Sequence, residues 1–378
     1  MTPGENRPLA ALQHRWKSGR FAPNGAAIPE ANEAPYRPLV RGGHLHTLLA
    51  YWLARWQRHS RARPRRLLLQ DGDQLVLHQQ GPRSWRPGHP VAVLLHGLAG
   101  CHQSSYMVRI ARKLVVRAVR TYRVDLRGAG AGALLARGGY SCVCLPDVHA
   151  ALQQVARWCP GSPIHLIGFS LGGNLALKCA ASPPPGPVRL QSVVAVCPPV
   201  DTESSSRCLS RGWGRLYDRH FVRCLYRRLL WRKRRRSDVL MGQLEGKPRT
   251  LREFDARWTA PVWGFASVEA YYQAANSQGD LQQARVPTLV LAAQDDPLVP
   301  PEGFLAVRPS PQVTLRLVPG GGHLGFVARG ADDPDRWWMD WRVLEWIEAH
   351  RPCAAPGGQA SSMRELTPCL KPGGCDAD

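Results

Sequence analysis

Residues 164–174 read Ile-His-Leu-Ile-Gly-Phe-Ser-Leu-Gly-Gly-Asn. The apolar run at the start is typical of a buried strand, and the residues after Ser170 are typical of a helix. A serine on the sharp turn between them needs Gly168 and Gly172 as neighbours, because strand and helix pass too close for a β-carbon. The turn presents the Ser170 hydroxyl at the carboxyl edge of a sheet, beside the first N–H groups of the helix. The stretch therefore predicts a nucleophile suited to acyl transfer.

A serine hydroxyl attacks effectively only when a histidine takes its proton and a carboxylate holds that histidine in one tautomer. On a sheet with such a turn, the acid and then the histidine follow the serine, each after a later strand. Residues 286–293 form an apolar run typical of a buried parallel strand, and Asp295 and Asp296 come just after it. Asp296 lies at the tip of the predicted loop, so we favour it as the acid and keep Asp295 as the alternative.

The next strand pattern predicts the histidine. Residues 313–318 read Val-Thr-Leu-Arg-Leu-Val and lead into a glycine-rich loop that carries His323. Taken singly, an aspartate before a proline is most often a turn residue, and a lone histidine near glycines most often has a structural role. Ser170, Asp296 and His323 together, in the required order and each after a strand, instead favour a catalytic triad.

Two backbone N–H groups would complete this site. Residues 91–95 form another apolar strand, which is followed by His96-Gly97-Leu98-Ala99-Gly100. The N–H groups of Leu98 and Leu171 are the expected donors of an oxyanion hole. His96 lies at the end of a core strand, where a hydrogen-bonded structural histidine is more common than a second base, so we leave it out of the chemistry.

The wider chain predicts an α/β fold. Strand and helix patterns alternate from residue 91 to about residue 325, which is typical of a mostly parallel sheet with helices on both faces. Residues 65–69 and 75–78 flank the turn signal Asp71-Gly72-Asp73 and would form an antiparallel start to this sheet. The predicted helices include residues 106–116, 147–158, 171–181 and the tryptophan-rich 337–347.

The pattern also predicts how the chain is divided. Residues 36–350 would form one α/β domain, since a single core can reach that size. Within it, residues 198–275 carry many aromatic and basic residues but no strand pattern, and we expect a helical cap insertion there that walls the pocket. Residues 1–35 and 351–378 are rich in Pro, Gly, Ala and Ser, so we expect flexible end segments.

The formal net charge is +22, and arginine accounts for 44 of the 50 basic residues. The densest basic cluster is residues 223–236, which could form a basic amphipathic helix that touches an anionic membrane or nucleic acid. A solvated outer face of the cap is the more common explanation of such a cluster. No motif specific to nucleic acids accompanies it, so we expect no specific nucleic-acid partner and at most weak contact with anionic membrane.

The chain has 11 cysteines, an odd number, scattered through apolar stretches. Cys142 and Cys144 lack the second pair that a zinc site needs, and the proposed chemistry requires neither metal nor cofactor. The N-terminal region lacks the apolar core of a signal peptide, and no apolar run has the length of a membrane span. We therefore expect a cytoplasmic protein with reduced thiols.

Between about residues 35 and 346, the chain resembles the α/β-hydrolase superfamily and, within it, the YheT-type hydrolases of the AB hydrolase 4 family. The resemblance rests on seven motifs: residues 44–49, residues 96–100 with Ser105-Tyr106, residues 125–130, residues 168–174, Arg252-Glu253-Phe254-Asp255 with Ala270-Tyr271-Tyr272, residues 295–297 and residues 321–326. It implies the α/β-hydrolase fold, carboxylic-ester hydrolysis, and Ser170, Asp296 and His323 as the triad.

Two functions follow as hypotheses. The first is a serine hydrolase that cleaves carboxylic esters, with short- to medium-chain acyl groups or lipid-like substrates, through an acyl-enzyme. The second is a non-catalytic protein on the same fold that binds anionic membrane or nucleic acid through residues 223–236. An intact triad favours the first hypothesis, because a binding scaffold has no need of three such residues.

Overall fold

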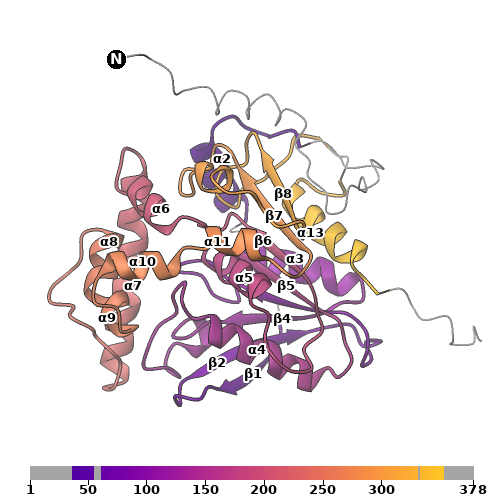
Figure 1. The fold of residues 1–378 in the computed structure, drawn as a ribbon, viewed down its shortest axis with the longest axis horizontal. Helices are drawn as coiled ribbons and strands as arrows, with labels where there is room; N and C mark the ends of the chain where they lie inside the picture. Colours follow the sequence, from indigo (N-terminus) through magenta and orange to yellow (C-terminus); the bar gives the residue numbers. More distant parts are fainter. Residues whose placement is uncertain (1–35, 55–60, 331–332, 353–378) are drawn as a thin grey trace, which may run out of the picture.

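The computed structural model describes residues 36–54, 61–330 and 333–352. The end segments predicted to be flexible, 1–35 and 351–378, lie outside these residues except for Arg351 and Pro352. In Figure 1 the sheet runs through the middle of the molecule, helices pack around it, and a helical insertion lies to one side.

The centre of the fold is an eight-stranded sheet with the order β1-β2-β4-β3-β5-β6-β7-β8. From β4 to β8 the neighbouring strands are parallel, whereas β2 is antiparallel to both β1 and β4. The strands are β1 (Arg63–Leu68), β2 (Gln74–Gln80), β3 (Val91–Leu95), β4 (Arg120–Asp125), β5 (Ile164–Phe169), β6 (Leu190–Val196), β7 (Thr288–Ala293) and β8 (Val313–Val318). The carboxyl ends of the parallel strands share one edge, so the loops that follow them gather there.

Helices cover both faces of this sheet, which confirms the predicted layers. Outside the insertion described below, the described helices are α2 (Gly43–Ala54), α3 (Ser105–Val116), α4 (Leu145–Trp158), α5 (Leu171–Ala181), α11 (Gln278–Gln283), α12 (Glu302–Leu305) and α13 (Trp338–Ala349), with a 3₁₀ turn η3 (Gly130–Gly132). Apolar residues of α4 and α5 join one core cluster, and those of α3 and α13 join the cluster on the other face. Every residue of β3, β5 and β7 is buried, as expected for strands covered on both sides.

Strand β4 was not predicted from the sequence. Its residues Arg-Thr-Tyr-Arg-Val-Asp contain two arginines, which hide the apolar pattern of a buried strand. The structure buries Arg123 completely, and its guanidinium donates a 2.7 Å hydrogen bond to the carbonyl oxygen of His102. A partner contributed by another loop thus makes an arginine acceptable inside the sheet.

A helical insertion connects β6 to β7, in the region where the sequence predicts a cap. It contains α6 (Thr202–Leu209), α7 (Gly214–Arg235), α8 (Leu251–Phe254), a π-helical turn η4 (Asp255–Thr259), α9 (Ala260–Val262) and α10 (Val268–Ala275). Figure 1 shows these helices at the left of the sheet. The buried guanidinium of Arg232 on α7 donates to the carbonyl oxygens of Ala133, Ala136 and Gly138, at 2.8, 2.7 and 2.5 Å. This side chain ties the insertion to the loop after β4.

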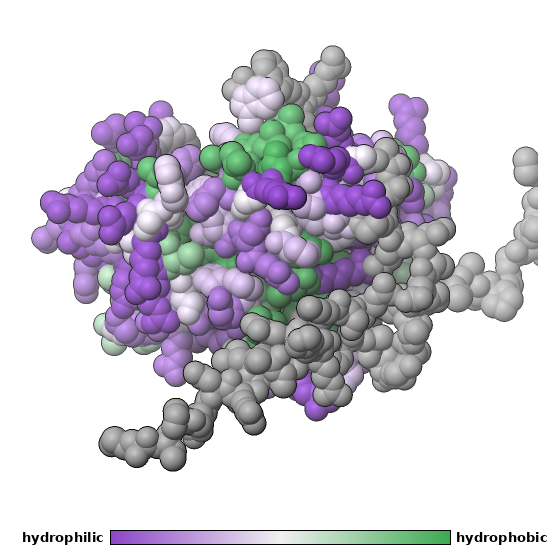
Figure 2. Space-filling view, turned by 90° about the horizontal axis from the view of Figure 1, so that it is seen from above, coloured by the Kyte–Doolittle hydropathy of each residue, from purple (hydrophilic) through white to green (hydrophobic). Residues whose placement is uncertain are grey.

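Figure 2 shows the molecule from above, which is the side where α2 lies in Figure 1. This face is mostly hydrophilic but carries an apolar patch. Four large apolar side chains of α2 are exposed: Leu45, Leu48, Tyr51 and Trp52. Within the described ranges, none of the helices combines the length and the apolar character that crossing a bilayer requires.

Candidate active site

The turn between β5 and α5 has the strained backbone that its sequence predicts. Ser170 has φ of 53° and ψ of −118°, in a region that residues with a side chain rarely adopt. A β-carbon placed on Gly168 would lie 2.0 Å from the carbonyl oxygen of Gly172, and one on Gly172 would lie 2.5 Å from that of Leu95. Both glycines are therefore needed for the close passage of strand and helix.

The structure brings the three predicted side chains together. Nε2 of His323 lies 3.0 Å from Oγ of Ser170, and Nδ1 lies 2.9 Å from Oδ2 of Asp296. With the proton on Nδ1, the imidazole donates to the carboxylate and accepts from the serine hydroxyl. The other oxygen of Asp296 accepts from the backbone N–H groups of Leu298 and Val299, at 2.8 and 3.1 Å. These two bonds hold the carboxylate toward the histidine.

Asp295 has a different partner from Asp296. Its Oδ1 accepts a 2.9 Å hydrogen bond from the backbone N–H of Gly322. Adjacent residues of an extended segment point to opposite sides, so one of the two carboxylates faces the His323 ring and the other supports the loop.

Helix α2 supports the same loop, a contribution that the sequence analysis missed. Thr47 Oγ1 accepts from the backbone N–H of His323 at 2.9 Å and donates to the carbonyl oxygen of Gly43 at 2.7 Å. A β-carbon on Gly43 would lie 1.6 Å from the carbonyl oxygen of Asp295, so α2 packs directly on both loops. The motif at residues 44–49 was the available signal, yet nothing in it reveals this long-range contact.

The loop after β3 forms a tight turn that exposes the N–H of Leu98. Gly100 N–H donates to the carbonyl oxygen of Gly97 at 3.1 Å, and Ala99 has φ of 59°, which a type II turn requires at its third residue. Leu98 and Leu171 both line the pocket that contains Ser170. In the described part of the chain, neither backbone N–H has an acceptor, so both are available to a bound oxygen.

Two side chains hold this turn, and the sequence analysis named neither as functional. Tyr106 Oη accepts from the N–H of Gly97 at 3.1 Å, and burial raises the pKa of this phenol, which keeps it neutral. Arg228, on α7 of the insertion, donates to the carbonyl oxygen of Ala99 at 3.0 Å. Long-range contacts of this kind leave no local pattern in the sequence.

His96 has the structural contacts expected of it. Its Nδ1 donates to the carbonyl oxygen of Gly97 at 2.8 Å, and its Nε2 accepts from the N–H of Leu126 at 3.2 Å. Burial lowers the pKa of this imidazole to about 4, so it is neutral at pH 7.

Among the residues that the structure describes, two groups of side chains have the composition of metal ligands. One consists of His78, His102 and Asp125, and the other of Cys197, Asp296 and His323. In the first group both imidazoles bond to Oδ2 of Asp125, and the rings are stacked with centroids 3.4 Å apart. The Asp125 carboxylate also accepts from the backbone N–H groups of His102 and Ala131, so it is well supplied with hydrogen-bond donors from the protein. In the second group, burial raises the pKa of Cys197, which disfavours the thiolate that binds metals.

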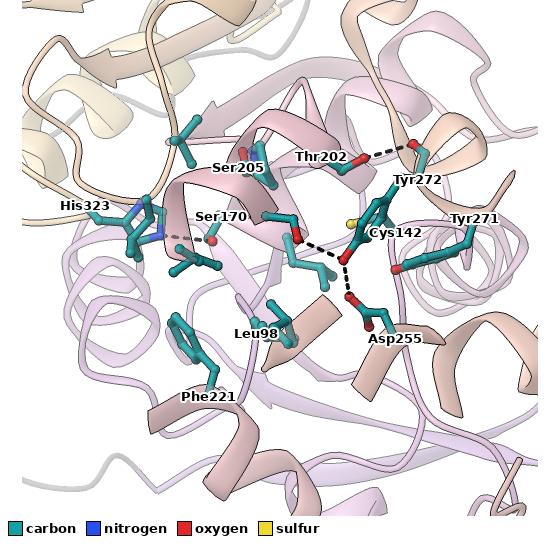
Figure 3. Close-up of a pocket in the computed structure, with 17 residues that line it drawn as sticks. Leu98, Cys142, Ser170, Thr202, Ser205, Phe221, Asp255, Tyr271, Tyr272 and His323 are labelled. Carbon is teal, nitrogen blue, oxygen red and sulfur yellow. Dashed lines mark hydrogen bonds between the residues drawn. The ribbon is translucent and has the colours of Figure 1, made fainter. Parts of the chain in front are cut away.

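Ser170 and His323 lie at one end of a pocket between the sheet edge and the insertion (Figure 3). The apolar part of its wall includes Leu98, Leu171, Pro199, Leu209, Phe221, Leu251, Leu298 and Val299. The other end is polar and carries Asp255, Tyr271 and Tyr272. The pocket can therefore hold an apolar chain and a polar group at once.

Part of the basic cluster at residues 223–236 is hydrogen-bonded to other segments of the protein. Arg228 and Arg232 donate to main-chain carbonyl oxygens of two loops, and Arg236 pairs with Asp238 and bonds to the carbonyl oxygen of Leu134. Arg228 and Arg232 lie four residues apart on one face of α7, and Arg236 directly follows the last residue of the helix. Arg223, Arg227, Lys233, Arg234 and Arg235 are exposed on the remaining surface.

Known proteins resemble this chain over most of its length. A model of the family described as Alpha/beta hydrolase family matches residues 92–338. Putative esterase YheT of Escherichia coli is 26% identical over 81% of this chain and 90% of its own length. Phospholipase ABHD3 of Mus musculus is 28% identical over 63% of this chain and 58% of its own length. The structure of Est1E from Butyrivibrio proteoclasticus with ferulic acid covers 75% of this chain and 98% of Est1E, with a TM-score of 0.50 and 15% identity, which supports the fold alone.

Proposed function

The chain belongs to the alpha/beta hydrolase family, and from this membership we propose that it is a serine esterase that cleaves carboxylic esters through an acyl-enzyme. One observation carries the proposal: the hydroxyl of Ser170, the imidazole of His323 and the carboxylate of Asp296 are hydrogen-bonded in series at the wall of a pocket. This arrangement is suited to nucleophilic attack on a carbonyl carbon.

In the first half of the proposed reaction, Ser170 attacks the ester carbonyl while Nε2 of His323 takes the hydroxyl proton. Asp296 holds the imidazole in the required tautomer and stabilises its protonated form. The oxygen of the tetrahedral intermediate accepts hydrogen bonds from the N–H groups of Leu98 and Leu171. The alcohol then leaves with the proton from His323, and Ser170 carries the acyl group.

In the second half, a water molecule replaces the alcohol. His323 takes a proton from this water, which attacks the acyl carbon and forms a second tetrahedral intermediate at the same two N–H groups. Breaking the bond to Ser170 releases the carboxylic acid, and His323 returns the proton to the serine.

The substrate would be a small ester or a lipid, with a short- to medium-chain acyl group. The apolar wall beside Ser170 supports an acyl chain at that end of the pocket. Among the relatives, YheT is named a putative esterase and ABHD3 a phospholipase, and both names refer to cleavage of esters.

A fluorophosphonate probe tests this proposal, because it reacts with an activated serine. We expect labelling of the wild type and none of Ser170→Ala. The control is Ser237→Ala, an exposed serine just after α7 of the insertion, which should label like the wild type. Equal labelling of Ser170→Ala and the wild type would refute the assignment of the nucleophile.

The other predictions from the sequence are still to be tested. A cytoplasmic location and weak contact with anionic membrane remain predictions, as does the non-catalytic alternative through residues 223–236. Sedimentation with anionic vesicles and with nucleic acid across a salt series tests that alternative, since phosphate-driven binding weakens steeply with salt. The alternative fails if the protein does not sediment with either at low salt.

A further inference from the structure

The polar end of the pocket contains a buried cluster of hydroxyl and carboxyl groups. Tyr272 is at its centre, with Asp255 on one side and Ser206 on the other (Figure 3). All three line the same pocket as Ser170. The proposed reaction uses none of them, so the cluster needs a separate explanation.

The hydrogen bonds within the cluster leave Asp255 incompletely satisfied. Its Oδ1 accepts from Oγ1 of Thr259 at 2.6 Å, and its Oδ2 accepts from the hydroxyl of Tyr272 at 3.0 Å. The Tyr272 oxygen, having donated its proton, lies 3.1 Å from Oγ of Ser206 and can accept from it. Each carboxyl oxygen can accept more than one hydrogen bond, so Asp255 keeps capacity for a ligand in the pocket.

The charge of Asp255 is also uncompensated. Among the described residues it makes no ion pair, and the nearby Arg252 pairs with Glu269 instead. Asp255 is only 9% exposed, and burial raises the pKa of its carboxyl to about 7. A buried carboxyl without a cation is costly when ionised, so an additional hydrogen-bond donor from a ligand would stabilise it.

The backbone brings Asp255 to this position through an uncommon element. Asp255 is the first residue of the π-helical turn η4, which widens the chain between α8 and α9. Single π-helical turns often occur at functional sites, because they reorient one side chain against its neighbours. The π-helical turn and the position in the pocket are thus two separate observations that indicate a functional role for Asp255.

A hydroxyl is the ligand that best matches this chemistry. It can donate to a carboxyl oxygen of Asp255 when the carboxyl is ionised, and it can accept the carboxyl proton when Asp255 is protonated. The Oγ of Ser206, whose own proton goes to the Tyr272 oxygen, can accept from a further donor. An anionic group would be repelled by the ionised carboxylate. An ammonium group would favour the ionised form, which burial disfavours here.

We propose that Asp255, Tyr272 and Ser206 form a subsite for a free hydroxyl group of the ester substrate. This inference rests on the proposed esterase function and specifies its substrates. The scissile carbonyl lies at Ser170, and the hydroxyl lies at the far end of the same pocket. The hydroxyl can belong to a polyhydric alcohol, as in glycerol monoesters, or to a hydroxylated acyl chain.

Matched esters test the proposal. We would measure kcat/KM for propyl octanoate, glyceryl monooctanoate and propyl 8-hydroxyoctanoate, which separate a hydroxyl on the alcohol from one on the acyl chain. The wild type should prefer one hydroxylated ester to propyl octanoate by about tenfold or more, because a buried polar site rejects an analogue that leaves it unpaired.

Asp255→Asn and Tyr272→Phe should each reduce that preference about tenfold and change the rate with propyl octanoate much less. Asp238→Asn, a surface carboxyl outside the pocket, serves as the matched control and should keep the wild-type preference. Fluorophosphonate labelling of Ser170 should persist in all three variants, so loss of the subsite is distinguishable from loss of the esterase.

Two outcomes would overturn the proposal. One is a wild type that cleaves all three esters with similar kcat/KM, which needs no variant to fold. The other is an equal loss of kcat/KM for all three esters in both pocket variants with labelling intact, because a purely structural role of Asp255 would affect every substrate alike.

Discussion

Arg228 of the insertion donates a 3.0 Å hydrogen bond to the carbonyl oxygen of Ala99, in the turn that follows β3. Ala99 has a positive φ, and the residue before it supplies one of the two candidate oxyanion donors. Helix α7 of the insertion thus holds the turn that carries Leu98. The insertion therefore contributes to the candidate site as well as covering it.

Arg228→Met should lower kcat about tenfold with a smaller change in KM. A hydrogen bond from a charged group contributes about 1.5–3 kcal/mol, and discounting this for partial exposure leaves about 1.4 kcal/mol, or one factor of ten. Steady-state kinetics on one ester would measure it. Arg227→Met, an exposed neighbour on α7, is the control and should behave as the wild type. Equal kcat values for both variants would show that the contact does not position the turn.

The two adjacent aspartates should differ sharply in their effect on catalysis. Asp296→Asn should lower kcat by about 10⁴, because an amide favours the wrong imidazole tautomer. Asp295→Asn keeps an oxygen that can accept from Gly322 N–H, so its kcat should fall by about tenfold or less. Turnover of an activated ester measures both. The reverse order of effects would make Asp295 the acid.

Asp255 should make the protein less stable as the pH rises from 4 to 7. The pKa of this carboxyl is raised from 3.8 to about 7, chiefly by burial and to a smaller extent by the charge of Asp218, while hydrogen bonds from Thr259 and Tyr272 oppose the shift. Between these values the folded chain retains a proton that the unfolded chain has released, so stability declines by up to about 1.4 kcal/mol per pH unit. Denaturant unfolding of wild type and Asp255→Asn across this range checks the sign. Parallel pH profiles for the two proteins would contradict it.

Gly168→Ala should destabilise the fold severely. The new β-carbon would meet the carbonyl oxygen of Gly172 at 2.0 Å, and backbone on both sides prevents easy relaxation, so we expect a loss of about 4 kcal/mol or more. Thermal unfolding measures this effect. Gly279→Ala is the matched control, since its β-carbon has no neighbour closer than 3.9 Å, and its midpoint should stay near that of the wild type.

Local patterns accounted for much of the fold. The predicted helix at residues 171–181 and the predicted strands at 91–95 and 313–318 match α5, β3 and β8 at both ends. These segments are apolar enough to reveal their structure without their neighbours. Strand β4 and helix α2 were not predicted. The buried position of Arg123 depends on its bond to His102, and the role of Thr47 depends on its bond to His323, and neither contact can be recognised from nearby sequence.

The sequence by itself predicted the alternation of strands and helices, apart from β4 and α2, and the glycine-flanked serine turn, and it identified Asp296 and His323 as candidate partners of that serine. Each of these predictions rests on a pattern within a few residues, such as glycines beside the serine or an acid and a histidine directly after a strand. Only the tertiary structure decided which aspartate faces His323 and that Arg228 reaches Ala99. Only the fold, too, placed the Asp255 carboxyl in the pocket of Ser170. Each of these depends on the direction of a side chain relative to a distant segment, and packing alone sets that direction.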